Sequence, residues 1–396
     1  MISFKNAYDQ VLQHILNLGD ETVSLLESTG RVLSEDIRAD RDFPPFNRST
    51  KDGIAIAFSA IEKGITRFKI EGVLSAGMPQ QTLSKDTNCF EIMTGAVLPE
   101  QADTIIMYEE TETEDGYISI SKTPNKGQNI HRQGTDEKEG AILLKKGTEI
   151  TAAVIGVLAS VGKNEVTVKK LPKICVVSTG NELVEVEDKP LPHQIRKSNS
   201  LSLFAALERV KITPTLLHLA DNQAIIEKEL EKALNNFDVL MLSGGVSKGK
   251  FDFIPDALDK LGITKVFHRV AQRPGKPFWF GVQNEKQKVI FSFPGNPVST
   301  FANYHVYFLP WLKKSLGVEA EKHTVILDEP VQPHPTLTLF TQVTTACHEG
   351  KLTVKTLKGN GSGDLVSLAL ADGFIRLPQG ETEIPAGTAV DFIKAS

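Results

Sequence analysis

Three short apolar runs, each followed by a turn rich in glycine or proline, constrain the fold of this chain more than any other feature of its sequence. The runs cover residues 174–177, 237–242 and 289–293, and apolar residues at helical spacing follow in 201–207 and 298–316. Strands that alternate with helices predict a parallel sheet covered by helices. Ligands of such sheets bind at the carboxyl ends of the strands. We therefore expect an α/β domain with a binding site at the three turns.

The turns have the composition of an anion-binding rim. They are Ser178-Thr179-Gly180-Asn181-Glu182, Ser243-Gly244-Gly245-Val246-Ser247 and Pro294-Gly295-Asn296-Pro297. Glycine lets the backbone approach a ligand closely, and N–H groups at the start of a helix attract phosphate. A single glycine turn can equally well do no more than end a strand. Three such turns at one edge of a sheet favour an anion site, although none is a Walker A loop or a dinucleotide-binding fingerprint.

Carboxylates and cations near turns extend this interpretation. Asp52 follows a loop with two adjacent prolines, and Asp252 lies just beyond the second turn. Such carboxylates can hold Mg²⁺ together with substrate phosphates, although Asp52 in an Asp-Gly pair can also be a simple turn former. Arg273 and Lys276 either clamp a phosphate or belong to a solvated surface turn. The residues thus predict an anionic, phosphorylated ligand without naming it.

The segments on either side of the α/β region are typical of β structure. Residues 50–145 contain short β-like runs between glycines and charged turns, and alternation returns after Pro330. Apolar residues at three- and four-residue spacing predict a first helix over 4–18, ended by Gly19. The acidic run 109–115 is expected to be a solvated hairpin or loop. The outline is therefore β-rich, then α/β, then β.

The composition excludes several classes of protein. With 396 residues, a formal net charge of −5 and a pI near 6.0, the chain lacks the basic stripe of a dedicated nucleic-acid binder. No apolar stretch approaches the roughly 18 residues of a membrane-spanning helix, and the first residues lack the plan of a signal peptide. Three widely separated cysteines exclude a disulfide framework and a four-cysteine zinc site. We expect a multidomain cytoplasmic protein.

Eight motifs, in order over nearly the whole chain, resemble those of one family. The chain is similar to the molybdopterin molybdenumtransferases, the MoeA and gephyrin E-domain family. Any one motif is weak, but eight in the same order make coincidence implausible. The motifs cover residues 46–53, 91–99 with 102–104, 127–130, 178–183, 243–247, 274–277, 294–299 and 361–365.

The resemblance implies an activity. Proteins of this family insert molybdate into the dithiolene of adenylylated molybdopterin and release AMP, with a divalent cation that is usually given as Mg²⁺. They are elongated homodimers, and the site at the α/β domain is completed by the inserted domain of the other subunit. The pterin adenylyltransferase is a possible partner protein, whereas neither nucleic acid nor a membrane is an expected partner.

The resemblance also implies a fold, which is multidomain α/β plus β with a central MogA-like α/β domain. The implied split, extended N-terminal domain covers 1–45 and 142–170, and a β-rich domain, 46–141, is inserted into it. The α/β molybdopterin-binding domain covers 171–322, and a small C-terminal β-barrel covers 323–396.

Roles of individual residues follow from the same resemblance. Catalytic roles fall on Asp52, Thr94, Glu182 and Asp252, and metal binding falls on Glu182, Asp221 and Asp252. Cleavage of a phosphoanhydride in a charged ligand needs cations that stabilise the developing oxygen charge rather than a protein nucleophile. The residues expected to bind the phosphate or the pterin are Ser243, Gly244, Gly245, Ser247, Arg273, Lys276, Pro294, Gly295 and Asn296.

Several positions depart from the usual motifs of the family. If these positions face the cleft, the site has fewer metal ligands and anchors phosphate or molybdate directly by cations, which predicts a weaker dependence on Mg²⁺. If several of them point outward, the changes are drift without effect on the site. Positions with a lost negative or a gained positive charge are Lys51, Asn181, Lys197, Lys248 and Lys250, and a basic residue of the family is replaced by Gln342.

Two other functions stay open at this point. A divergent, non-catalytic paralogue would bind molybdopterin as a carrier or scaffold and would not release AMP. A pterin adenylyltransferase would transfer a nucleotide from ATP, but such enzymes resemble the α/β domain alone, whereas the motifs of this chain span four domains.

Overall fold

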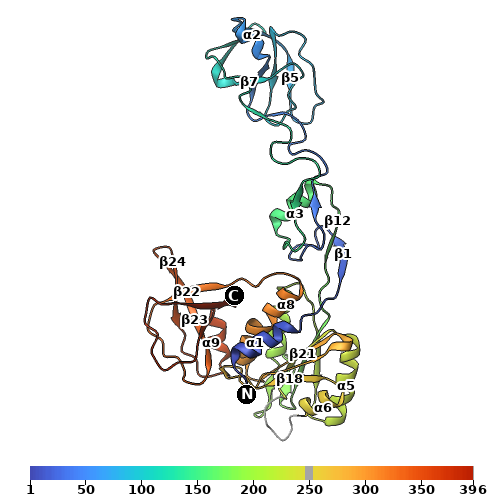
Figure 1. The fold of residues 1–396 in the computed structure, drawn as a ribbon, viewed down its shortest axis with the longest axis vertical. Helices are drawn as coiled ribbons and strands as arrows, with labels where there is room; N and C mark the ends of the chain where they lie inside the picture. The colour runs from blue at the N-terminus through green and yellow to red at the C-terminus, as the bar shows by residue number, and fades with distance from the viewer. Residues whose placement is uncertain (246–252, 396) are drawn as a thin grey trace.

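The computed structural model of the chain describes residues 1–245 and 253–395 and shows an elongated molecule (Figure 1). A β-rich domain lies at one end. A narrow middle section joins it to a broad end that holds the α/β domain and a C-terminal barrel. Ser247, Lys248, Lys250 and Asp252 lie outside the described residues. Within the described ranges, no helix is long and apolar enough to cross a membrane.

The α/β domain is built on one six-stranded sheet of order β16-β13-β17-β21-β20-β18. The first four strands of that order are parallel, as the sequence predicts. β20 runs antiparallel to β21, and β18 runs antiparallel to β20 and so in the same direction as the first four. A single short helical turn, Asn284–Lys286, joins β20 to β21, and so short a connection allows only an antiparallel pair. The strands are β13 (Ile174–Thr179), β16 (Thr215–Leu219), β17 (Val239–Ser243), β18 (Thr264–His268), β20 (Trp279–Gln283) and β21 (Lys288–Phe293).

Helices cover both faces of this sheet because its central strands are apolar on both sides. In β13, Ile174 and Val176 belong to one core cluster, whereas Cys175 and Val177 belong to the other. The first cluster is covered by α1, α4, α7 and α8, and the second by α5 and α6. The predicted helix over 298–316 is confirmed as α7 and α8 joined by the π-helical turn Tyr304–Phe308. The helices are α1 (Phe4–Gln13), α4 (Asn199–Glu208), α5 (Gln223–Asn236), α6 (Ile254–Lys260), α7 (Pro297–Asn303) and α8 (Leu309–Ser315).

The first helix ends earlier than predicted. α1 stops at Gln13 rather than continuing to Gly19, so the prediction was wrong about its C-terminal end. The indole N–H of Trp311 donates to the carbonyl of His14 at 2.7 Å, and Ile15 is exposed instead of packing on the core. The apolar spacing therefore continues beyond the helix because the chain after Gln13 packs on α8, where the N–H of the buried Leu16 donates to Ser315 Oγ at 3.2 Å.

The middle section is made of two segments that are far apart in the sequence and lie side by side (Figure 1). β1 (Asp20–Ser24) pairs antiparallel with β12 (Glu165–Lys169), and β2 (Ile37–Arg38) pairs with β11 (Ile142–Leu144). The helix α3 (Ala152–Ser160) supports this section through its buried Leu158. The chain thus leaves the middle section, forms the β-rich domain and returns to it.

The β-rich domain holds a second six-stranded sheet, of order β7-β4-β6-β5-β9-β8. Its β8–β9 hairpin contains most of the acidic run 109–115, so the predicted hairpin is confirmed. A separate pair, β3 (Arg48–Ser49) with β10 (Ile130–His131), lies where the chain enters and leaves the domain. The elements are β4 (Gly53–Ile56), α2 (Phe58–Glu62), β5 (Arg67–Leu74), β6 (Asn88–Ile92), β7 (Thr104–Met107), β8 (Thr111–Glu114) and β9 (Tyr117–Ile120).

The C-terminal region confirms the predicted small barrel. Its strands follow the order β23-β24-β22-β26-β25, and an additional pairing of β25 with β23 closes the ring. The short strand β19 (Gln272–Arg273) of the α/β region pairs with β23 and attaches the barrel to that domain. The elements are β22 (His323–Leu327), β23 (Thr338–His348), β24 (Lys351–Thr356), α9 (Leu365–Leu370), β25 (Gly373–Leu377) and β26 (Ala389–Lys394).

Candidate functional site

The three predicted turns meet at one cavity of about 980 Å³. They follow β13, β17 and β21, which are neighbours in the sheet, so their carboxyl ends lie at the same edge. The first residue of α4, Asn199, ties two of the turns together. Its side-chain amide donates to Ser243 Oγ at 2.9 Å and to the carbonyl of Gly295 at 2.7 Å. The cavity thus has a fixed rim made of backbone and small side chains.

The C-terminal barrel closes a second side of the cavity. The side-chain amide of Asn296 donates to Ser362 Oγ at 2.8 Å, and the N–H of Val298 donates to the carbonyl of Ser362 at 3.0 Å. Asp364 caps α9 by accepting from the backbone N–H groups of Val366 and Ser367, each at 3.1 Å. Its pKa is lowered by these and the other backbone hydrogen bonds that it accepts. The motif at 361–365 therefore shapes the wall rather than supplying a reactive group.

Arg273 and Lys276 bring positive charge to the cavity. Both side chains are exposed, both line the cavity, and neither forms an ion pair with a described residue. Arg273 ends β19, and Lys276 follows the turn at Gly275. Two cations without carboxylate partners on one turn can bind a phosphate or another oxyanion.

Glu182 and Asp221 also line the cavity and supply its described carboxylates. Asp221 accepts from the N–H of Asn181 at 3.2 Å, and Asn181 Oδ1 accepts from the N–H of Asp221 at 3.1 Å. Within the described residues, no three His, Cys, Asp or Glu side chains form a metal-binding group. Two carboxylates that face a phosphate site still fit Mg²⁺, which commonly takes one or two carboxylates together with substrate phosphates.

Most of the described altered positions have partners or lie away from the cavity. Lys197 lines the cavity, but its ammonium is paired with Glu185, and this contact lowers the pKa of Glu185. Lys51 is exposed in the β-rich domain. Gln342 is buried in the barrel wall, where its amide lies 3.4 Å from Ser367 Oγ. The charge change expected from the sequence is therefore partly neutralised inside the protein.

Asp52 and Thr94 lie together, but not at the cavity. Asp52 Oδ1 accepts from the N–H of Thr94 at 2.6 Å and from its hydroxyl at 2.9 Å, and these hydrogen bonds lower the pKa of Asp52. Gly53 begins β4 directly against β7, where a Cβ atom would overlap the carbonyl of Ile106. The pair lies in the β-rich domain, at the opposite end of the molecule from the α/β domain (Figure 1). One chain therefore does not bring all the predicted site residues together.

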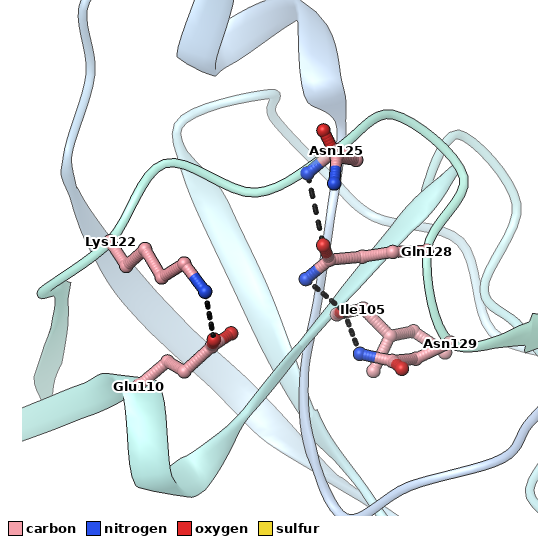
Figure 2. Close-up of polar contacts among 6 residues, drawn as sticks. All are labelled: Ile105, Glu110, Lys122, Asn125, Gln128 and Asn129. Carbon is pink, nitrogen blue, oxygen red and sulfur yellow. Dashed lines mark hydrogen bonds and ion pairs between the residues drawn. The ribbon is translucent and has the colours of Figure 1, made fainter.

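The motif at 127–130 supports the loop that carries Asp52. Figure 2 shows the side chains of Gln128 and Asn129 donating to the carbonyl of Ile105, at 3.2 and 3.0 Å. The Gln128 amide oxygen accepts from the N–H of Asn125 at 2.9 Å, and a Lys122–Glu110 ion pair of 3.4 Å lies beside it. The carbonyl of Asn129 accepts from the N–H of Thr50 at 2.9 Å. This motif therefore supports the loop at Thr50 and does not itself supply a ligand-binding group.

Two polar residues of the site region carry no assigned role in the sequence analysis. Asn199 ties two turns together, and Gln272 lines the cavity from β19. No local spacing marks either of them, because Asn199 is defined by its contacts with two distant turns and Gln272 by its contacts with the helical segment after β21. The pair Ser198-Asn199, directly after the altered position Lys197, is the signal that could have identified Asn199.

The fold and the cavity define an elongated, multidomain protein whose α/β domain has a cation-bearing cavity between three strand-end turns and a C-terminal barrel. Three family profiles match in order. The MoeA N-terminal region (domain I and II) matches residues 2–162, the probable molybdopterin binding domain matches 175–314, and the MoeA C-terminal region (domain IV) matches 324–395. The chain belongs to the MoeA family of molybdopterin molybdenumtransferases.

Relatives of known name agree over the full length. The molybdopterin molybdenumtransferase of Synechocystis sp. is 38% identical, and the match covers 99% of each chain. The protein of the same name from Bacillus subtilis is 32% identical over 94% of this chain and 89% of its own. The crystal structure of the molybdopterin biosynthesis protein MoeA from Pyrococcus horikoshii OT3 superimposes with a TM-score of 0.83 at 27% identity, covering 99% of each chain.

Proposed function

We propose that this chain is a molybdopterin molybdenumtransferase, which inserts molybdate into adenylylated molybdopterin and releases AMP in the biosynthesis of the molybdenum cofactor. The observation that carries the proposal is the cavity at the three strand ends, with Arg273 and Lys276 unpaired among the described residues. Relatives that bear this name match the chain from end to end. The non-catalytic carrier is not favoured, because the residues expected at the site are present.

The cations and turns would act on the phosphoanhydride. Water supplies the oxygen that replaces AMP on the pterin phosphate, so no protein nucleophile is needed. Arg273 and Lys276 bind the phosphates and stabilise the charge that develops on the departing AMP. The turns at 243–245 and 294–296 shape the pocket for the pterin and its phosphate. Asn199 keeps these two turns at a fixed separation.

Glu182 and Asp221, together with Asp252 from outside the described residues, are the proposed ligands of Mg²⁺. Mg²⁺ would neutralise phosphate charge when it is bound. Asp52 and Thr94 are proposed to reach the cavity of a second copy, because the elongated shape separates them from the cavity of their own chain (Figure 1). The proposal therefore includes a homodimer. It also includes a pterin adenylyltransferase partner that supplies the substrate. The four proposed domains cover 1–45 with 142–170, 46–141, 171–322 and 323–396.

The test is release of AMP from adenylylated molybdopterin, with and without molybdate and Mg²⁺. Wild-type protein is expected to release AMP only when molybdate is present, and Lys276→Ala and Asp52→Ala are each expected to lower the rate by about 100-fold or more. Lys85→Ala is a matched control, since it removes an exposed cation from the same β-rich domain outside the motifs, and it is expected to leave the rate unchanged. Tight binding of the pterin without release of AMP from wild-type protein would contradict the proposal and favour a carrier.

A further inference from the structure

A buried polar cluster lies directly behind the turn that carries Arg273 and Lys276. Its members are Gln272, Asn303 and Tyr307, and all three are 0% exposed. Gln272 belongs to β19, Asn303 ends α7, and Tyr307 lies in the π-helical turn that follows α7. The surrounding core is apolar and aromatic, so this cluster is an exception within it.

Three hydrogen bonds hold the side chain of Gln272 in one orientation. Its Nε2 donates to the carbonyl of Pro274 at 3.0 Å and to Asn303 Oδ1 at 2.8 Å, and the hydroxyl of Tyr307 donates to its Oε1. A backbone carbonyl can only accept, so the group that faces Pro274 must be the NH₂ end of the amide. The roles of Asn303 and Tyr307 follow from that assignment.

The turn packs directly on these amides. Gly275 has φ +86°, and a Cβ atom there would lie 2.5 Å from Asn303 Oδ1 and 2.8 Å from Gln272 Nε2. The ring of Tyr307 is held in turn by Phe278, with ring centroids 4.7 Å apart. The aromatic core, the polar cluster and the turn therefore form one continuous packed unit.

Stability alone gives little reason for this cluster. Burying amides and a hydroxyl is costly unless every group is bonded, and apolar side chains of the same shape would fill such a position at no loss. The amide of Asn303 even leaves its Nδ2 without a partner in the described structure. What the cluster supplies is a fixed position for the Pro274 carbonyl, between Arg273 and Gly275.

We infer that Gln272 is a positioning residue, which acts through the Pro274 carbonyl to hold Arg273 and Lys276 in the geometry that binds the phosphate of the substrate. The inference rests on the proposed function, because it concerns the same phosphate-binding turn. Gln272 itself transfers no proton and contributes no charge. Its effect passes through the two cations, so it becomes smaller when one of them is removed.

The test uses AMP as the probe and the full-length protein. Gln272→Met keeps an unbranched side chain but removes the amide, and it is expected to weaken AMP binding about tenfold by calorimetry. Lys276→Ala is expected to weaken it by a similar factor, and the loss in the double variant is expected to be clearly smaller than the product of the two single losses, because only Arg273 is left to be positioned. In the AMP-release assay, Gln272→Met is expected to raise KM and also to lower kcat, since the two cations bind the phosphate before reaction and stabilise the charge that develops during it.

Two matched variants separate positioning from a general loss of stability. Gln283→Met removes a glutamine amide at the end of β20, 3.5 Å from the carbonyl of Leu261, and is expected to leave AMP affinity unchanged. Tyr307→Phe leaves the Gln272–Pro274 hydrogen bond in place, so AMP affinity is expected to change less than about twofold even if Tm falls. If Gln272→Met does not fold, Asn303→Ala takes its place, with an expected loss of about threefold that is again smaller in the Lys276→Ala background.

Three results would overturn the inference. The first is unchanged AMP affinity in Gln272→Met, and the second is unchanged AMP affinity in Lys276→Ala. The third is a loss of AMP affinity in the double variant that equals the product of the two single losses. Failure of the proposed function is a separate result, because it appears as wild-type protein that binds AMP but does not release it from adenylylated molybdopterin.

Discussion

Asp52 is held ionised by a single neighbour. Thr94 donates to it through both its backbone N–H and its hydroxyl, and these bonds lower the pKa of Asp52. Because the folded-state pKa lies below that of the unfolded chain, the contact stabilises the protein above the unfolded-state pKa. This stabilisation is lost as the pH falls through the folded-state pKa. Thr94→Val keeps the N–H and removes the hydroxyl, so the pKa of Asp52 is expected to rise toward its ordinary value of about 4.

Carboxyl NMR of Asp52 measures this change directly. Thr94→Ser is the control, since serine keeps the hydroxyl and is expected to leave the pKa of Asp52 nearly unchanged. A pKa that is equal in wild type and Thr94→Val would show that the backbone N–H alone holds the carboxylate.

His305 gives a second pH dependence, of another origin. Burial, with a smaller contribution from the nearby charge of Arg209, lowers its pKa to about 4, and neither ring nitrogen has a partner in the described structure. The unfolded chain takes up a proton near pH 6.5, whereas the folded chain does not. Stability is therefore lost as the pH falls from about 6.5 toward 4. Relative to pH 7.5, the loss at pH 5 amounts to about 2 kcal/mol.

His305→Phe is expected to remove that loss while keeping a ring beside Phe301. Urea unfolding at pH 7.5 and pH 5 measures it, followed by the fluorescence of Trp279 and Trp311, which are both buried in the α/β domain. Equal pH sensitivity of wild type and His305→Phe would refute the assignment.

At the scale of elements, the start of α4 fixes the ends of β17 and β21 through Asn199. Asn199→Asp keeps the shape but replaces the donor by oxygens that face the carbonyl of Gly295. We expect a loss of about 1–3 kcal/mol in stability, because acceptors are left unpaired, and a raised KM for adenylylated molybdopterin. Thermal unfolding and AMP release measure the two effects.

The matched control is Asn222→Asp, which makes the same chemical change at the start of the next helix, α5. Asn222 caps α5 by accepting from the N–H of Ile225 at 3.1 Å. Aspartate caps a helix as well as asparagine does, so Asn222→Asp is expected to leave stability and KM unchanged. Equal effects of the two substitutions would mean that the donor function of Asn199 is not what matters.

The sequence predicts those elements whose signal is local. The strands at 174–177 and 289–293 are continuous apolar runs that end in glycine or proline, and the structure confirms both as β13 and β21. The early end of α1 could not be predicted, because it depends on Trp311, which lies far away in the chain. The antiparallel edge of the sheet depends on β20, whose aromatic residues face an interior formed by other elements.

The same difference between local signals and contacts of distant segments applies to the site. Its turns and its cations are visible in the sequence as glycines, prolines and charges at strand ends. Asn199 and Gln272 escape that analysis because each is defined by contacts with other strands and turns. The ion pair between Lys197 and Glu185 likewise depends on the tertiary structure, and it neutralises one of the free charges that the sequence suggests.

The shape of the whole molecule separates two sets of proposed site residues. Arg273 and Lys276 lie at the cavity of the α/β domain, whereas Asp52 and Thr94 lie in the β-rich domain at the other end (Figure 1). The middle section between them is braced by the β1–β12 and β2–β11 pairs, which hold the two ends apart. A site that uses both sets therefore needs two copies of the chain.

This geometry predicts complementation between two inactive variants. Asp52→Ala has an intact cavity and Lys276→Ala has an intact β-rich domain, so a mixed dimer holds one complete site and one site with both defects. Random pairing on co-expression makes about half of the dimers mixed, and AMP release is expected to recover to about a quarter of the wild-type rate. Mixed dimers isolated through two different affinity tags should reach about half of the wild-type rate per dimer. If these mixed dimers form and stay inactive, Asp52 and Lys276 do not act in one site across the two copies. The cavity of each chain would then work without residues of the other chain.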